Sequence, residues 1–302
     1  MQTRAVIDIG SHSALLLIAR DDAGGPEVLH EDYVITALGA DMEATGRISE
    51  QALGRASAAV GEFHDRCKAA RVSSLVCVGT SALREAENAA HVLGQLAERV
   101  GCPVRVLTEE QEAVLTRRGA LSGLDVSQGA VVCDLGGRST EITWPGFTGS
   151  LPVGSLGGTE RYLSGDPPDP AECRRLEEHV ESILSAIGKP APGSPLVCSG
   201  GTATTLASMD LRLVEFTPRL VHGHVIGHDR LDELTARLVG LPVAERRELQ
   251  GLEPDRAPVM PAGALIVGRL LRWSSNTQIT VSARGLTWGV WLAWSEIMIL
   301  DG

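Results

Sequence analysis

Two short segments place an aspartate at the end of an apolar run and a glycine two positions later. The first reads Ala5-Val-Ile-Asp8-Ile-Gly10-Ser11-His12-Ser13, and the second reads Val131-Val-Cys-Asp134-Leu-Gly136-Gly137-Arg138-Ser139-Thr140. Glycine lets backbone N–H groups approach a ligand, and successive N–H groups with a hydroxyl form a concave donor set that suits a phosphate. The aspartates would repel a phosphate directly, so we expect Asp8 and Asp134 to hold Mg²⁺ (or Mn²⁺), which then binds the phosphate oxygens.

A third anion site is expected at a glycine pair that precedes a predicted helix over Ala203–Met209. The N-terminus of a helix presents free N–H groups and a partial positive charge, which favour an anion. The predicted phosphate-binding residues are those of the three segments: Gly10, Ser11, Ser13, Gly136, Gly137, Arg138, Ser139, Thr140, Gly200, Gly201 and Thr202. Each segment has a simpler interpretation, because Asp and Gly also form ordinary hairpin turns and a glycine pair also suits a flexible connection.

The two aspartate loops belong to a longer internal repeat. Leu75-Val-Cys-Val-Gly79-Thr80 resembles Leu196-Val-Cys-Ser-Gly200-Gly201-Thr202, and each is a strand-like run that leads into a turn and a helix. Asp8 precedes Thr80 by 72 residues, and Asp134 precedes Thr202 by 68. Two motifs in the same order at similar separation predict a duplicated α/β domain, in which Asp8 superposes on Asp134 and Thr80 on Thr202. The duplication disfavours the hairpin-turn interpretation.

The segments between the motifs have the periodicity of helices and strands. Ser49 is predicted to N-cap a helix whose apolar residues recur at helical spacing up to Cys67. Asp169-Pro170 is predicted to begin a helix that ends at Gly188. Other helices are predicted over 85–100, 109–121, 229–239, 258–272 and 286–300, with a strand at 278–283. We expect two domains, 1–124 and 125–302, and leave open that the last helix packs back on the first domain.

Composition and charge exclude several classes of protein. The net charge of −11, from 27 Lys and Arg against 38 Asp and Glu, argues against nonspecific nucleic-acid binding and against attraction to an anionic membrane. The apolar segment Leu286–Leu300 contains Glu296 and is shorter than the roughly 20 residues of a membrane span. Asp8 interrupts the first apolar run, which argues against a signal peptide. The six cysteines lack a C-x-x-C pair, so we expect reduced thiols and a cytoplasmic protein.

Longer stretches of the chain resemble the exopolyphosphatase/guanosine-pentaphosphatase (Ppx–GppA) family, which has the actin/hexokinase/Hsp70 type of fold. The resemblance implies an α/β protein with duplicated ribonuclease-H-like domains flanking a cleft. The similar stretches follow the family's order over nearly the whole chain: Asp8–Ser13, Gly79–Asn88, Glu110–Ala113, Asp134–Glu141, Leu151–Gly154, Gly200–Leu206, Val221–His224, Gly251–Ala257 with Ala262-Gly263, and Ser282–Leu286.

The resemblance also implies an activity, which is the Mg²⁺-dependent removal of a terminal phosphate from inorganic polyphosphate or guanosine pentaphosphate (pppGpp). Glu112 matches the glutamate that acts as general base on water, and Arg84 matches a substrate-binding arginine. Asp134 and Glu141 match acidic residues that handle the metal and the phosphate, so Glu141 joins the predicted catalytic residues and, with Asp8 and Asp134, the predicted metal ligands. Without the resemblance, the simpler interpretation of Glu112 is a solvated carboxylate on a helix, and that of Arg84 is an ion pair with a neighbouring glutamate at the surface.

The sequence departs from the family's pattern at positions that carry positive charge. Arg138 replaces the third glycine of a Gly-Gly-Gly run. Its side chain either binds a phosphate or fills the loop and excludes the phosphate. Charge-assisted hydrogen bonds contribute on the order of 1.5–3 kcal/mol each, so the loss of several weakens the binding of a polyanion. The other departures are His12 for Asn, Leu15 for Arg or His, Ala37 for Arg, Gly157 for Arg, and Thr287-Trp288 for Arg-Glu.

Two other functions stay open at this point. One is a catalytically degenerate family member that binds phosphate compounds or alarmones without turnover. The other is an ATP-dependent small-molecule kinase, which is less favoured because Glu110–Ala113 and Val221–His224 resemble the hydrolase family. The expected partners are polyphosphate or guanosine pentaphosphate, without nucleic acid or membrane, and a homodimer is left open.

Overall fold

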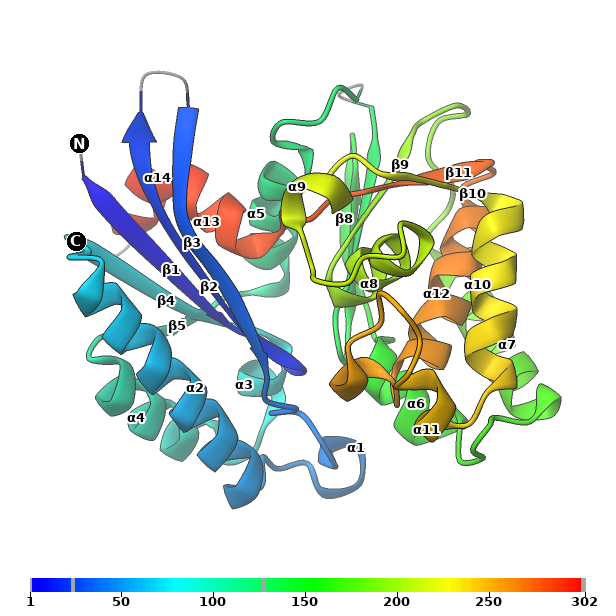
Figure 1. The fold of residues 1–302 in the computed structure, drawn as a ribbon, viewed down its shortest axis with the longest axis horizontal. Helices are drawn as coiled ribbons and strands as arrows, with labels where there is room; N and C mark the ends of the chain where they lie inside the picture. The colour runs from blue at the N-terminus through cyan, green and yellow to red at the C-terminus, as the bar shows by residue number, and fades with distance from the viewer. Residues whose placement is uncertain (1, 23–24, 127–128, 300–302) are drawn as a thin grey trace. The chain divides into compact units, whose positions relative to one another are not determined.

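The computed structural model describes residues 2–22, 25–126 and 129–299 of the chain (Figure 1). The chain divides into two compact units, Met1–Gly119 with Leu286–Gly302, and Ala120–Gly285. We call them unit 1 and unit 2. This division falls after Gly119, five residues before the predicted boundary between 1–124 and 125–302. The residues from Leu286 onward belong to unit 1, the arrangement that the sequence left open for the last helix.

Unit 1 contains a five-stranded mixed sheet with the order β3-β2-β1-β4-β5. The first three strands form an antiparallel meander, and β4 and β5 continue the sheet parallel to β1. The strands are β1 (Thr3–Ile9), β2 (Ser13–Asp22), β3 (Gly25–Ile35), β4 (Ser74–Gly79) and β5 (Val104–Val106).

Successive residues of β1 supply two separate hydrophobic cores, one on each face of the sheet, because side chains alternate along a strand. Ile7 packs on the face covered by α2 (Glu50–Ala69) and α4 (Ala89–Val100). Val6 packs on the opposite face with Trp288 and Trp291 of α13. The remaining helices of this unit are α1 (Met42–Thr45), α3 (Ser81–Glu85), α5 (Glu109–Leu121, which continues into unit 2), α13 (Leu286–Leu292) and α14 (Trp294–Ile299).

Two helices predicted as continuous are interrupted. The predicted helix over 85–100 is interrupted at 86–88: Glu85 ends the short helix α3, and α4 begins at Ala89, directly after Asn88, whose side chain makes two hydrogen bonds of 3.0 and 2.9 Å with the backbone of Ile48. The predicted helix over 286–300 is divided between α13 and α14. Ser49 caps α2 as predicted, since its side chain accepts a hydrogen bond from the N–H of Ala52.

Unit 2 contains a six-stranded mixed sheet with the order β10-β11-β9-β6-β7-β8. Its strands β6, β7 and β8 form an antiparallel meander, β9 and β11 run parallel to β6, and β10 is an antiparallel edge strand. The strands are β6 (Val131–Leu135), β7 (Thr140–Trp144), β8 (Phe147–Leu151), β9 (Leu196–Ser199), β10 (Val225–Gly227) and β11 (Gln278–Val281).

The two sheets share one topology, which confirms the predicted duplicated ribonuclease-H-like fold. In each sheet the third, second, first and fourth strands of the unit lie side by side in that order. They are followed by β5 in unit 1 and by β11 in unit 2, and unit 2 adds β10 at the edge beside β11. The register refines the predicted equivalence. Asp8 pairs with Val78, which lies two residues before Thr80. Asp134 pairs with Ser199, which lies three residues before Thr202. The sheet register therefore makes Gly201, and not Thr202, the counterpart of Thr80.

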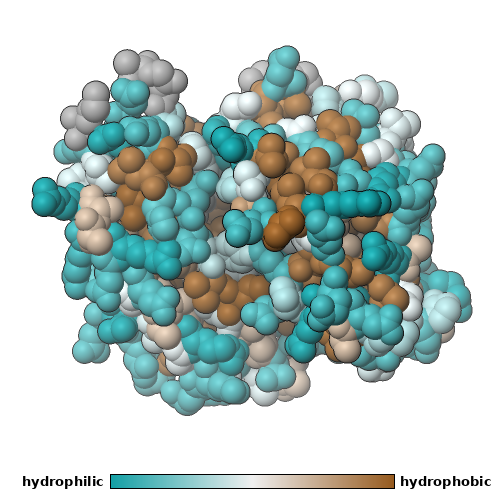
Figure 2. All heavy atoms as spheres, in the orientation of Figure 1, coloured by the Kyte–Doolittle hydropathy of each residue, from teal (hydrophilic) through white to brown (hydrophobic). Residues whose placement is uncertain are grey.

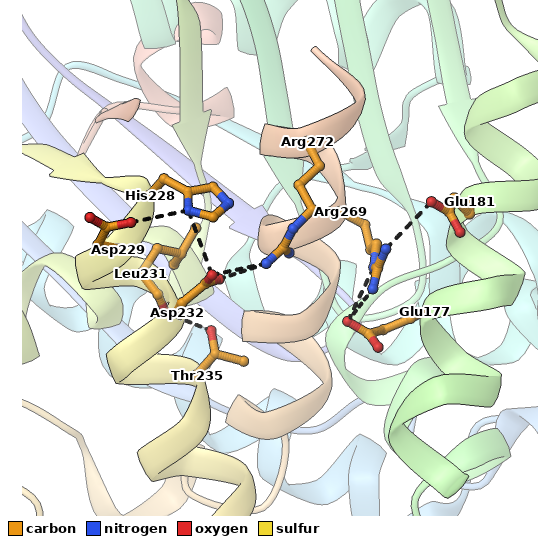
Figure 3. Close-up of polar contacts among 9 residues, drawn as sticks. All are labelled: Glu177, Glu181, His228, Asp229, Leu231, Asp232, Thr235, Arg269 and Arg272. Carbon is orange, nitrogen blue, oxygen red and sulfur yellow. Dashed lines mark hydrogen bonds and ion pairs between the residues drawn. The ribbon is translucent and has the colours of Figure 1, made fainter. Parts of the chain in front are cut away.

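The outer helices of unit 2 are joined by ion pairs (Figure 3). Arg269 on α12 (Met260–Trp273) reaches Glu177 on α7 (Pro170–Ala186) at 2.7 Å, and Arg272 reaches Asp232 on α10 (His228–Gly240) at 2.8 Å. α7 begins in a capping box of Asp169 and Glu172, as its Asp-Pro start predicts. The other helices are α6 (Ser155–Tyr162), α8 (Gly201–Asp210), α9 (Pro218–Val221), α11 (Val243–Arg246) and a 3-10 helix (Pro254–Arg256).

The surface is largely hydrophilic on the face drawn in Figure 2, with smaller hydrophobic areas. Val214 and Leu220 are among the exposed large hydrophobic side chains, at 90% and 52% exposure. Among the helices of the described ranges, none has the length and apolar character needed to cross a bilayer.

Candidate active site

The first predicted phosphate loop links β1 to β2 in unit 1. It is closed by a 3.0 Å hydrogen bond from the N–H of Gly10 to the carbonyl oxygen of Ser13. The carbonyl oxygens of Ser11 and His12 accept N–H groups from the segment after β3, at 2.8 to 3.0 Å. The backbone of this segment, which contains Ala37, therefore fixes the loop in place.

The second predicted phosphate loop repeats this geometry in unit 2. The N–H of Gly136 donates to the carbonyl oxygen of Ser139 at 3.0 Å. The carbonyl oxygens of Gly136 and Gly137 accept N–H groups of Ser155, Leu156 and Gly157 at the start of α6, at 2.7 to 3.0 Å. The N–H and C=O of a trans peptide point in opposite directions, so the N–H groups of Gly137 and Arg138 point away from α6.

Gly154 allows α6 to lie directly against this loop. A Cβ atom at Gly154 would stand 2.5 Å from the carbonyl carbon of Gly137 and 2.5 Å from the nitrogen of Arg138. Any other residue would force the loop and the helix apart. The only signal of this role in the sequence is the resemblance of the segment Leu151–Gly154 to the family.

Two carboxylates lie side by side beneath the second loop. Asp134 and Glu141 are register partners on β6 and β7, which places their Cβ atoms about 4.5–5.5 Å apart on one face of the sheet. Ser199 donates to Asp134 Oδ1 at 2.7 Å, and Ser150 donates to Glu141 Oε1 at 2.8 Å. Burial raises the pKa of Asp134, and the hydrogen bond from Ser199 opposes that rise.

The pair fits Mg²⁺, which binds one or two carboxylates and keeps several water ligands. Within the part of the chain that the structure describes, no three His, Cys, Asp or Glu side chains gather as a metal cluster. The corresponding position in unit 1 lacks the second carboxylate, because Asp8 has Leu15 as its register partner. Of the three predicted metal ligands, the structure thus brings together Asp134 and Glu141, and Asp8 lies in unit 1.

Three predicted phosphate-binding hydroxyls make other contacts. Ser11 accepts a 3.1 Å hydrogen bond from the N–H of Ala82, and Thr140 donates to the carbonyl oxygen of Val153 at 2.6 Å. Thr202 is 4% exposed and packs against Gly263 of α12, where an added Cβ would stand 2.6 Å from its Oγ1. These hydroxyls therefore position the loops and helices around the site, and the backbone N–H groups are the better candidates for phosphate.

The third predicted anion site, at the start of α8, adjoins the carboxylate pair. Gly200 caps the helix with φ 89°, and a Cβ there would stand 3.1 Å from Asp134 Oδ1. The guanidinium of Arg256 lies against Gly201 and pairs with Glu253 at 2.9 Å. Arg256 was not predicted as a site residue. Its only signal was the resemblance of Gly251–Ala257, because a side chain 55 positions away in sequence gives no local pattern.

Arg84 and Glu112 form a partly buried ion pair in unit 1. Arg84 Nη1 donates to Glu112 Oε2 and to the carbonyl oxygen of Leu107, both at 2.9 Å. Glu112 is 6% exposed, so it is not the solvated helix carboxylate of the simpler interpretation. Arg84 has Glu112 as its close partner, in place of the neighbouring glutamates considered from the sequence.

Comparison with known proteins supports the predicted family. The sequence matches the Ppx/GppA phosphatase family over residues 17–296. The chain belongs to the Ppx/GppA phosphatase family. It is 32% identical to exopolyphosphatase 2 of Mycobacterium tuberculosis, over 96% of this chain and 97% of that protein.

Solved structures of family members agree with this assignment. The crystal structure of the Aquifex aeolicus Ppx/GppA family member is 31% identical, with a TM-score of 0.81 over 100% of this chain and 99% of that one. An exopolyphosphatase-like protein gives a TM-score of 0.90 at 27% identity, over 99% of both chains.

Proposed function

We propose that this chain is a phosphohydrolase that removes the terminal phosphate of inorganic polyphosphate or guanosine pentaphosphate, with Mg²⁺ or Mn²⁺. The observation that carries the proposal is the paired arrangement of Asp134 and Glu141 beneath a loop whose N–H groups point away from α6. Membership of the Ppx/GppA family and the name of the mycobacterial relative support the same substrate class.

Asp134 and Glu141 are the residues proposed to hold the metal, which when bound neutralises negative charge on the phosphate oxygens. The N–H groups of Gly137 and Arg138 and the start of α8 are proposed to bind and orient the phosphate. Arg256 adds positive charge beside α8. Phosphoryl transfer depends mainly on such positioning and charge stabilisation, so these groups suffice without a covalent intermediate.

Glu112 is proposed to accept a proton from the water that attacks the terminal phosphorus, as the bond from phosphorus to the bridging oxygen breaks. Its buried carboxylate is held by Arg84 at 2.9 Å, which fixes the direction of the proton-accepting oxygens. A well-placed general base contributes about 10²–10⁴ in rate. We propose that Arg84 also contacts the substrate.

The test is phosphate release from polyphosphate, guanosine pentaphosphate and ATP with Mg²⁺. Glu112→Gln is expected to lower kcat by about 10²–10⁴. Glu110→Gln is the matched control, since Glu110 is an exposed glutamate in the same turn of α5, and it is expected to leave the rate within about twofold of wild type. Binding of these compounds without phosphate release would identify a non-catalytic protein, and transfer of a phosphate from ATP to a small molecule would identify a kinase.

A cytoplasmic location and reduced, structural thiols are part of the same proposal. The six cysteines are free, and burial raises the pKa of all six, with Cys67 raised to about 11. Thiols of this kind are poor nucleophiles. Cell fractionation tests the location, and light scattering tests the homodimer that the sequence leaves open.

A further inference from the structure

The arginine inside the second phosphate loop lies next to a glutamate of α6. Arg138 Nη1 stands 3.6 Å from Glu160 Oε2, with the two side chains 11% and 22% exposed. The loop backbone cannot move easily toward or away from this glutamate, because α6 binds the carbonyl oxygens of Gly136 and Gly137 and touches the loop at Gly154. Any exchange of partners by Arg138 must therefore occur through its side chain.

The contact with Glu160 is weaker than the one a phosphate can make. A charge-assisted hydrogen bond between guanidinium and carboxylate is typically about 2.7–2.9 Å, so a separation of 3.6 Å is an ion pair without that bond. A phosphate carries more charge and can accept two parallel hydrogen bonds from a guanidinium.

We infer that Glu160 competes with the substrate's phosphate for the guanidinium of Arg138 and so lowers the affinity of the site. The inference rests on the proposed function, because it assumes that the second loop binds a phosphate. Glu160 acts on binding in two ways: it holds Arg138 before a phosphate arrives, and it repels the incoming anion. The two effects can be separated, since only the first requires Arg138.

The test is a double-mutant cycle on binding, with inorganic tripolyphosphate and Mg²⁺ as the probe. All proteins carry Glu112→Gln to prevent turnover, and calorimetric titration gives Kd for the parent, Glu160→Gln, Arg138→Gly and the double variant. Glu160→Gln is expected to lower Kd by about threefold to tenfold with Arg138 present, and by less than about twofold in the Arg138→Gly background. Glu178→Gln on α7 is the matched control, because it removes one exposed carboxylate from the same unit.

An equal effect of Glu160→Gln in both backgrounds would overturn the inference, since Glu160 would then act only by repulsion. Weaker binding in Glu160→Gln with Arg138 present would also overturn it, because Glu160 would then position the guanidinium for the substrate. Thermal unfolding of each variant checks that unit 2 stays folded. The proposed function fails separately if tripolyphosphate binds with this pattern but wild type releases no phosphate, and the absence of any binding by the parent overturns both.

Discussion

The close approach of Gly154 to the second loop predicts that Gly154→Ala impairs the site in a protein that still folds. The added Cβ would stand 2.5 Å from backbone atoms of Gly137 and Arg138, whereas ordinary contacts begin at 3.4 Å. The loop must therefore move by about 1 Å relative to α6, which is held by hydrogen bonds of 2.7 to 3.0 Å. Such a displacement can lower kcat/KM by about 10²-fold, and the crowding costs about 1–3 kcal/mol of stability.

The measurement combines phosphate-release kinetics with denaturant unfolding. Gly157→Ala is the matched control, because its Cβ would stand 3.9 Å from Arg138 Cα, an ordinary contact, and alanine favours the helix. We expect Gly157→Ala to retain wild-type kinetics. Wild-type kinetics in Gly154→Ala would refute the reasoning that the loop and α6 have a single productive separation.

Four further predictions concern charge at the site. Asp134→Asn is expected to abolish Mg²⁺-dependent activity without lowering the unfolding midpoint at neutral pH. Burial of the charged Asp134 costs stability, and Asn can still accept the hydrogen bond from Ser199. A variant that unfolds would contradict this prediction. Because burial raises the pKa of Asp134, Mg²⁺ binding that needs its ionised form should weaken, as the pH decreases, at a higher pH than an ordinary aspartate gives, and Mg²⁺ titrations of the wild type at several pH values check this. Excess chelator should remove activity, and full activity in its presence would exclude the metal. Arg138→Gly is expected to weaken polyphosphate binding by roughly 1.5–3 kcal/mol, and a gain of polyphosphatase activity would show that Arg138 blocks the loop.

The sequence was sufficient for the fold because its signals were local and repeated. The apolar runs that end at Asp8 and Asp134 became equivalent strands, and the Gly-rich segments became the turns after them. The resemblance of ordered motifs along the chain supplied the family. The sequence was less reliable where a tertiary contact overrides a local pattern, as with the side chain of Asn88, whose bonds to Ile48 accompany the break between α3 and α4.

The site was predictable only in part, because its contacts join segments far apart in the chain. The loops could be located from their own residues, but the backing of the second loop by α6 and the position of Arg256 beside Gly201 depend on packing. Hydroxyls were assigned to phosphate by residue type, whereas Ser11 and Thr140 make backbone hydrogen bonds instead. Side-chain partners of this kind become visible only when the helices are in place.

The discontinuity of unit 1 has a consequence for how the protein is made on the ribosome. Unit 2 is one continuous stretch, whereas the face of the first sheet that contains Val6 is covered by Trp288 and Trp291. That face lacks the cover of α13 while Ala120–Gly285 is being synthesised, which takes about ten to thirty seconds at about 5–20 residues per second. Nascent chains of this protein should therefore bind chaperones that recognise apolar strands until translation passes Leu286, after which α13 closes the sheet.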